Sequence, residues 1–245
     1  MTAAAMAGQG ELLAQDHHVH SNFSDDASGT VAENIAAAQA RGLRTLCLAD
    51  HVRNSTRWLP DFLDTVQSAA DAADIEVLVG VEAKILDHTG RLDLPADMPA
   101  VHRILIADHQ YPSTDGPVPA AEARRRLDIG ELSIEEAVRT LVVATMRAMQ
   151  RTPGAQLAHL FSLLPKLGLD EDVVDADQIE ALAAAAWQTG AVVEANEKWG
   201  CPSSGVLAEF AAAGVTVVAS SDSHRAADVG VYDRVAALTE GIALA

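Results

Sequence analysis

Two pairs of residues near opposite ends of the chain carry side chains that are well suited to bind metal. His18 and His20 stand two residues apart at the end of an apolar stretch, and Asp222 and His224 stand two apart after another one. Residues i and i+2 of a β-strand point to the same face of a sheet, so each pair can aim both side chains at one point. The sequence therefore predicts a metal site built from both ends of the chain.

Other imidazole and carboxylate side chains also follow apolar runs. A single histidine is more often a hydrogen-bonded core or surface residue than a metal ligand. Six of the nine histidines, however, stand at the end of a strand-like run, which is where an α/β barrel carries its functional groups. His17, His88 and His102 do not fit this pattern, and we assign none of them to metal. The candidate ligands are His18, His20, Asp25, His51, Glu82, His109, His159, Asp222 and His224.

So many nitrogen and oxygen ligands exceed what one ion uses, because zinc takes about four. We therefore expect two to three divalent ions, and a ligand set of imidazole and carboxylate suits Mn, Fe or Zn. Asp25 follows the first strand closely enough to turn back into the site, but a turn-forming aspartate fits this position equally well. Basic side chains close to the ligands are candidates for binding an anion: Arg53, Arg225, Lys84 and Lys198.

Seven apolar runs alternate with segments of helical character. Thr30 with Glu33 is typical of a capping box at a helix start, and Asp177 with Glu180 repeats this pattern. Strands that alternate with helices predict parallel βαβ units. Since no linker interrupts the pattern, we expect one barrel-like α/β domain over residues 1–245. The expected strands cover residues 11–19, 44–49, 75–81, 103–107, 156–161, 191–195 and 215–220.

One segment departs from this alternation. Residues 111–131 are rich in proline, glycine and arginine, so we expect an irregular segment that lies over one end of the barrel as a lid or side wall. The three consecutive arginines at 124–126 are more typical of a solvated helix face than of a binding patch.

Composition narrows the class of protein. The chain has 245 residues, a formal net charge of −18 and a pI near 4.7, which argues against non-specific binding of nucleic acid or anionic lipid. No apolar run approaches the roughly 20 residues that cross a bilayer, and the N-terminal residues lack a secretory signal pattern. We therefore expect a cytoplasmic protein that acts on a small molecule. The sequence leaves its oligomeric state open.

The motifs, in chain order, resemble those of the polymerase and histidinol phosphatase (PHP) family. They are DHHVHS at 16–21, ADH at 49–51, GVE at 80–82, DH at 108–109, AH at 158–159, EAN at 194–196 and SSDSH at 220–224. The resemblance spans nearly the whole chain. It implies a distorted (β/α)7 TIM-like barrel, which agrees with the seven runs counted above.

The resemblance also implies a trinuclear metal site. One ion would be held by His18, His20, Glu82 and Asp222, and Glu82 would bridge to a second ion. His109 and His159 would complete that second site.

The third ion is implied to lie on Asp25, His51 and His224. Some family members have histidine where this chain has Asp25. An oxygen ligand at this position can shift the preferred metal.

On this basis we expect a metal-dependent phosphoesterase, and most specifically a histidinol-phosphatase-like phosphomonoesterase acting on a small phosphorylated metabolite. A hydroxide that bridges two ions would attack phosphorus. Glu82 and Asp222 would act in catalysis as ligands, and Arg53 and Arg225 would do so by clamping phosphate through their planar guanidinium groups.

Other functions remain open at this stage. A phosphodiesterase acting on a cyclic or dinucleotide phosphate would need the same ligands. A metal-dependent amidohydrolase that cleaves C–N bonds would commonly use a carboxylated lysine where this chain offers Glu82. A catalytically silent domain would have lost ligands, and none is obviously missing. An assay of the reaction products separates these functions.

Overall fold

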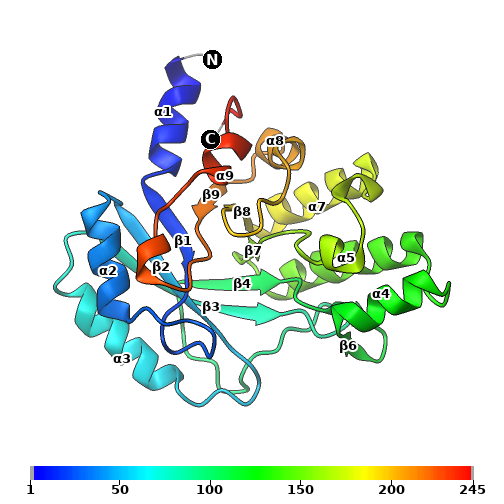
Figure 1. Ribbon diagram of the computed structural model, residues 1–245, viewed down its shortest axis with the longest axis horizontal. Helices are drawn as coiled ribbons and strands as arrows, with labels where there is room; N and C mark the ends of the chain where they lie inside the picture. Colours follow the sequence, from blue (N-terminus) through cyan, green and yellow to red (C-terminus); the bar gives the residue numbers. More distant parts are fainter. Residues whose placement is uncertain (1–2, 244–245) are drawn as a thin grey trace.

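A nearly closed barrel of seven parallel strands forms the centre of the molecule (Figure 1). The computed structural model describes residues 3–243. The strands are ordered β1-β2-β3-β4-β7-β8-β9. The two ends of this order meet where Val19 forms a parallel bridge with Ser223, and the amide of His20 donates to the carbonyl of Ser223 at 2.9 Å. The predicted α/β barrel is confirmed.

The barrel strands are short, and their bounds differ from the predicted runs mainly at the ends. The first run was predicted too long, since Glu11 belongs to a helix, α1 (Ala3–Leu12). The fifth strand stops early because His159 and Phe161 have φ of 35° and 74°, which breaks the extended backbone. The strands are β1 (Gln15–Val19), β2 (Thr45–His51), β3 (Glu76–Lys84), β4 (Arg103–Ala107), β7 (Gln156–Ala158), β8 (Val192–Asn196) and β9 (Val217–Ser220).

Small side chains fill the inside of the barrel. Cys47, Ala49, Ala107 and Ala158 pack there, together with one leucine, Leu105. On β3, a glycine at position 80 completes this packing, because an added Cβ would lie 3.0 Å from the Cys47 sulfur. The carboxyl ends of the strands are left to the larger polar side chains described below.

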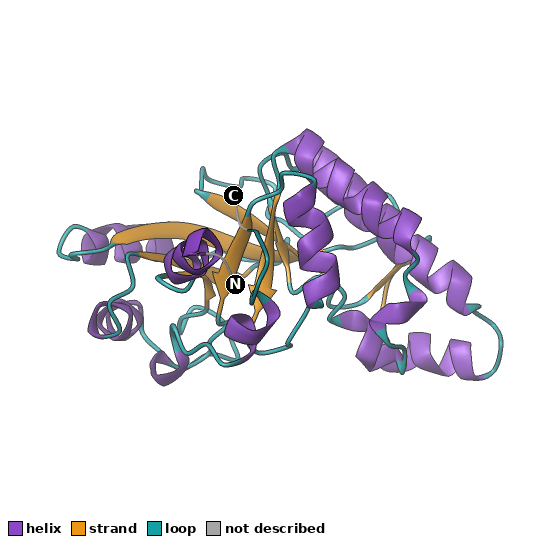
Figure 2. Cartoon of the chain, turned by 90° about the horizontal axis from the view of Figure 1, so that it is seen from above, coloured by secondary structure: helices purple, strands orange, loops and turns teal. Residues whose placement is uncertain are grey.

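Two apolar layers attach the helices to the outside of the barrel (Figures 1 and 2). Helices α2 (Val31–Ala40) and α3 (Leu59–Ala70) cover β1, β2 and β3. Helices α5 (Ile134–Arg151), α7 (Ala176–Thr189) and α8 (Ser204–Ala212) cover the opposite side. The shorter helices are α6 (Leu163–Leu167), α9 (Arg234–Leu238), η1 (Glu171–Val173) and η2 (Ala226–Asp228). Over residues 3–243, no helix combines the length and apolar character needed to cross a membrane.

The helix starts agree with the sequence in one case and differ in another. At α2, Thr30 and Glu33 form the predicted capping box. At α7 the predicted pair is wrong, because the helix begins two residues earlier and Asp175 caps it together with Gln178. The same spacing occurs twice in this stretch, so spacing alone does not choose the start. Asp177 lies in the first turn, where a carboxylate interacts favourably with the helix dipole.

Residues 111–131 are ordered, and the prediction of an irregular segment is wrong. A short hairpin of β5 (Tyr111–Ser113) and β6 (Gly116–Val118) precedes helix α4 (Ala120–Asp128). The prolines lie opposite each other in the hairpin, at Pro112 and Pro117. The arginine run lies on α4, where Arg125 and Arg126 pair with Glu122 one turn away. The lid-like role of this segment stays a prediction.

Candidate metal centre

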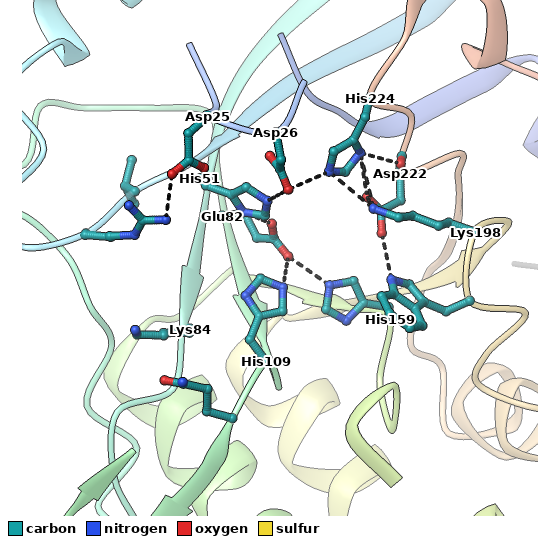
Figure 3. A pocket seen from close by; sticks show the side chains of 14 residues that line it. Asp25, Asp26, His51, Glu82, Lys84, His109, His159, Lys198, Asp222 and His224 are labelled. Carbon is teal, nitrogen blue, oxygen red and sulfur yellow. Dashed lines mark hydrogen bonds and ion pairs between the residues drawn. The ribbon is translucent and has the colours of Figure 1, made fainter. Parts of the chain in front are cut away.

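The carboxylate of Glu82, near the end of β3, lies at the centre of a cluster of imidazoles (Figure 3). Its Oε1 atom lies 2.8 Å from His159 Nε2 and 3.1 Å from His109 Nε2. Its Oε2 atom faces three further rings, with His51 Nδ1 at 2.6 Å and the Nε2 atoms of His18 and His20 at 3.6 Å. The ends of four strands, β1, β2, β4 and β7, therefore bring one imidazole or more to a single carboxylate, as predicted from their spacing.

Asp222 and His224 extend this cluster on the side of β9. Asp222 Oδ1 lies 3.4 Å from His20 Nε2 and 3.5 Å from His224 Nδ1. His224 Nε2 in turn lies 3.3 Å from Asp26 Oδ2, which is also 3.5 Å from His51 Nε2. The cluster thus continues from Glu82 to the loop after β1.

The loop after β1 differs from the prediction, because Asp26 joins the cluster and Asp25 does not. Asp25 is 68% exposed, and its Oδ2 atom lies 3.2 Å from the guanidinium of Arg53 (Figure 3). Both aspartates line the same pocket. The two residues are of the same type and differ by one position in their distance from the strand, so the sequence signal for Asp25 applied equally to Asp26.

Buried ligand atoms without hydrogen bonds show that this donor set fits a metal ion. Among the described residues, His18 Nε2, His20 Nε2 and Glu82 Oε2 have no hydrogen-bond partner, even though His51 Nδ1 approaches Glu82. Leaving buried polar atoms unpaired is costly. Three groups of ligand atoms each lie within 4.8 Å of one another: His18 with His20 and Glu82, His20 with His51 and His224, and His51 with Glu82 and His109. A divalent cation bound by these atoms would satisfy them.

The charges of the cluster stabilise one another. Burial alone would raise the pKa of Glu82, but the imidazoles of His109 and His18 hold it well below its usual range. Burial opposes protonation of His18 in the same way, yet the carboxylates of Glu194 and Glu82 raise the pKa of His18 well above its usual value. For His20 burial dominates and lowers the pKa to about 3.

Glu194 of β8 contacts Nδ1 of His18, the ring nitrogen that does not face Glu82. The carboxylate is fully buried, and both of its oxygens lie 3.2 Å from His18 Nδ1. It also accepts hydrogen bonds from Gln156 Nε2 at 2.6 Å, the His159 amide at 2.6 Å and Asn196 Nδ2 at 2.7 Å. A carboxylate on one ring nitrogen of a histidine leaves the other nitrogen to face a metal. The sequence places Glu194 at a strand end without a role, and the structure supplies one.

Asp108 plays the same part for His159. Its Oδ1 atom lies 3.3 Å from His159 Nδ1 and accepts a hydrogen bond from the Ser162 hydroxyl at 2.6 Å. Burial opposes protonation of His159, but the hydrogen bonds with Asp108 and Glu82 raise the pKa of His159 to about 10. The Nε2 atom of His159 is thereby directed at Glu82.

Two further buried aspartates hold loops rather than histidines. Asp50 accepts hydrogen bonds from the amides and hydroxyls of Ser21 and Ser24. Asp16 accepts from the amides of Ser221 and Gly230 at 2.9 Å. These contacts fix the loops that follow β1 and β9, which carry Asp26, Asp222 and His224.

A cavity of about 390 Å³ opens above the cluster, and three cationic side chains line it. Arg53 is paired with Asp25, Lys84 Nζ lies 3.5 Å from Asp93, and Lys198 Nζ lies 3.4 Å from Asp222. Arg225 does not line this cavity. It is 70% exposed, and its guanidinium pairs with Asp228 at 2.8 Å. The structure therefore brings three of the four predicted basic side chains to the site.

Comparison with known families adds a second line of observation. The PHP domain matches residues 16–115, which include the first four motifs, from His18 to His109. The chain is thus similar to the PHP domain over this part of its length. The match covers the first part of the barrel, and the ligands from β7 to β9 lie beyond it.

The chain is also similar to several proteins named as probable phosphatases. One from Aliivibrio fischeri is 37% identical over 92 residues, which is 33% of this chain and 34% of the relative. The chain thus matches about a third of the length of that relative. One from Acetivibrio thermocellus is 26% identical over 237 residues, covering 93% of this chain and 86% of the relative.

Among solved structures, the chain is similar to histidinol phosphate phosphatase from Lactococcus lactis, which was determined with zinc, L-histidinol and phosphate. The TM-score is 0.67 at 17% identity, and the match covers 92% of this chain and 90% of the other. This likeness shows that the two proteins share the same α/β barrel fold.

Proposed function

We propose that this protein is a metal-dependent phosphoesterase that removes phosphate from a small phosphorylated metabolite. The observation that carries the proposal is the set of buried, unpaired ligand atoms around Glu82 at the floor of a cavity lined by cationic side chains. A cluster of metal ligands beside cationic groups is what an anionic substrate such as a phosphate ester requires. The names of the sequence relatives support the same reaction class.

The ligands divide into sets that agree in part with those implied by the sequence. His18, His20, Glu82 and Asp222 are proposed for one ion, and Glu82 with His109 and His159 for a second. For a third ion, His51 and His224 are proposed together with Asp26 in place of Asp25. Bound divalent ions would supply an activated water and neutralise phosphate oxygens. The preference among Mn, Fe and Zn stays open.

The protein's own residues bind and orient the substrate in this proposal. Lys198 and Arg53 both line the cavity above the ligand cluster, and Lys84 lies on the strand that carries Glu82. Each of them is paired with an aspartate, so binding a phosphate would exchange a carboxylate for a phosphate oxygen. Charge-assisted bonds of this kind set the position of the phosphate relative to Glu82.

The cavity and the charge of the chain favour a small substrate. A volume of about 390 Å³ suits a metabolite rather than a polymer, and the net charge of −18 disfavours long polyanions. An amidohydrolase would commonly join its ions through a carboxylated lysine, and this chain offers Glu82 instead. The nearby Lys84, on the same strand, is paired with Asp93. This arrangement favours phosphate ester hydrolysis over C–N bond cleavage.

The test is a product assay on the metal-depleted protein reconstituted separately with Mn, Fe and Zn. The panel contains phosphomonoesters, including L-histidinol phosphate, together with cyclic and dinucleotide diesters and an amide substrate. We expect metal-dependent release of inorganic phosphate from at least one monoester. Cleavage of diesters or amides without any monoester hydrolysis would contradict the proposal and assign the other reaction.

A further inference from the structure

Two consecutive residues of the loop after β8, Lys198 and Trp199, contact different oxygens of the Asp222 carboxylate. The indole Nε1 of Trp199 donates a hydrogen bond to Asp222 Oδ2 at 3.0 Å. The Nζ of Lys198 lies 3.4 Å from the other oxygen, Oδ1 (Figure 3). Oδ1 is also the oxygen that faces His20 and His224, so the tryptophan holds the oxygen that points away from the ligand cluster.

The backbone of Asp222 adopts a conformation that its surroundings must stabilise. Asp222 has φ of 52°, in the left-handed region that a residue other than glycine rarely adopts, and it is 3% exposed. Non-glycine residues persist in this region only when their surroundings fix them. The side chain of Asn196 lies 3.5 Å from Oδ2, which leaves the indole as the shorter contact to this oxygen.

The loop that carries Trp199 is itself firmly built. The amide of Trp199 donates to Asn196 Oδ1 at 2.9 Å, and the guanidinium of Arg234 donates to the carbonyl of Lys198 at 2.8 Å. The ammonium of Lys166 lies 4.0 Å from the centroid of the indole ring, within the range of a cation–π contact. These contacts order a tryptophan that remains 39% exposed at the cavity wall.

We propose that Trp199 is a positioning residue of the metal centre, in which its indole N–H fixes Asp222 Oδ2 so that Oδ1 faces the ion. The proposal rests on the role of Asp222 as a ligand in the proposed function. Trp199 acts through Asp222, and the hydrogen bond rather than the packing of the ring carries the effect. The other tryptophans offer contrasts, since Trp58 packs against aromatic rings and Trp187 is 64% exposed on α7.

The experiment measures zinc binding to the metal-depleted protein by calorimetry, without substrate. Trp199→Phe removes the N–H and keeps the aromatic ring, and Trp187→Phe is the matched control. We expect Trp199→Phe to weaken zinc binding by at least about tenfold, as is typical for losing the partner of a metal ligand, and the control to match the wild type. A thermal melt verifies that both variants are folded.

A double-mutant cycle with Asp222→Asn separates positioning from a general structural effect. If Trp199 acts through Asp222, Trp199→Phe changes zinc affinity little in the Asp222→Asn background. Wild-type affinity in Trp199→Phe, or fully additive losses in the cycle, would overturn the proposal. A protein that shows the expected zinc losses but releases no phosphate would overturn the proposed function and leave this inference standing.

Discussion

Replacing Glu194 with glutamine tests how the carboxylate behind His18 supports the metal centre. Glu194 is fully buried and accepts hydrogen bonds from three neutral donors in addition to His18. Burial raises its pKa, but the charge of His18 and the other contacts lower it below the usual value. Glutamine has nearly the same shape, so the substitution removes the charge and one acceptor without creating a cavity.

The hydrogen bonds set the size of the expected effect. Oε1 faces the His159 amide and Asn196, and Oε2 faces Gln156 at 2.6 Å. A side-chain amide presents an oxygen on one side only, so at least one of these donors would meet an NH₂ group. A hydrogen bond to a charged acceptor contributes about 1.5–3 kcal/mol, and the remaining bonds lose their charge assistance. We therefore expect Glu194→Gln to lower the free energy of unfolding by about 2–4 kcal/mol.

Metal binding should fall as well, because His18 loses the partner that orients its ring. Changes to such partners typically weaken metal affinity about 10–100-fold, or about 1.4–2.7 kcal/mol. Urea unfolding of the metal-depleted protein and calorimetric zinc titration measure the two effects. Glu180→Gln, an exposed change on α7, is the control. Wild-type stability and wild-type zinc affinity in Glu194→Gln would refute the assigned role.

Four further outcomes are expected. Zinc affinity should rise between pH 6 and pH 8. The pKa values of His18 and His159 are raised, to about 10 for His159, so zinc must displace protons from these imidazoles. A constant Kd across this range would contradict the assignment of these histidines as ligands. Protonation of His159 also stabilises the metal-free protein, because its pKa is raised from the usual 6.5 to about 10 in the folded state. This stabilisation is fully present below about pH 6.5 and is lost as the pH rises toward 10. Urea unfolding at several pH values measures it. Asp26→Asn should lower the number of bound metal ions measured by elemental analysis, whereas Asp25→Asn should not, and the reverse result would restore Asp25 as the ligand. Lys198→Met should raise KM for a phosphomonoester about tenfold and Arg225→Ala much less, because Lys198 lines the cavity above the cluster and Arg225 does not. Equal effects of the two substitutions would contradict this assignment.

The clustering of the candidate ligands was predictable because parallel strands bring their carboxyl ends together. His18 with His20, and Glu82 at the end of β3, follow from two-residue periodicity and from the convergence of strand ends in a barrel. The pattern of seven runs predicted the architecture for the same reason. These features depend on regular backbone geometry, which sequence spacing reports directly.

The features that sequence spacing did not reveal depend on irregular backbone. Asp25 and Asp26 are adjacent, and only the turn after β1 decides which carboxylate faces His51 and His224. Arg225 follows a predicted ligand by one residue, but its guanidinium pairs with Asp228 and does not line the cavity. The hydrogen bond of Trp199 to Asp222 joins two loops that are separated by more than twenty residues. None of these contacts follows from a period of two or 3.6.

The proposed role of Glu82, as the carboxylate that joins the metal sites, is the centre of this account. The decisive measurement compares wild-type protein with Glu82→Ala, after metal depletion and reconstitution, for bound metal and for phosphate released from a phosphomonoester. We expect the wild type to require metal for phosphate release, and Glu82→Ala to lose bound metal and hydrolysis together, because five imidazoles face this one carboxylate. A Glu82→Ala protein that keeps its metal and full activity, or a metal-loaded wild type that releases no phosphate from any monoester, would contradict the account.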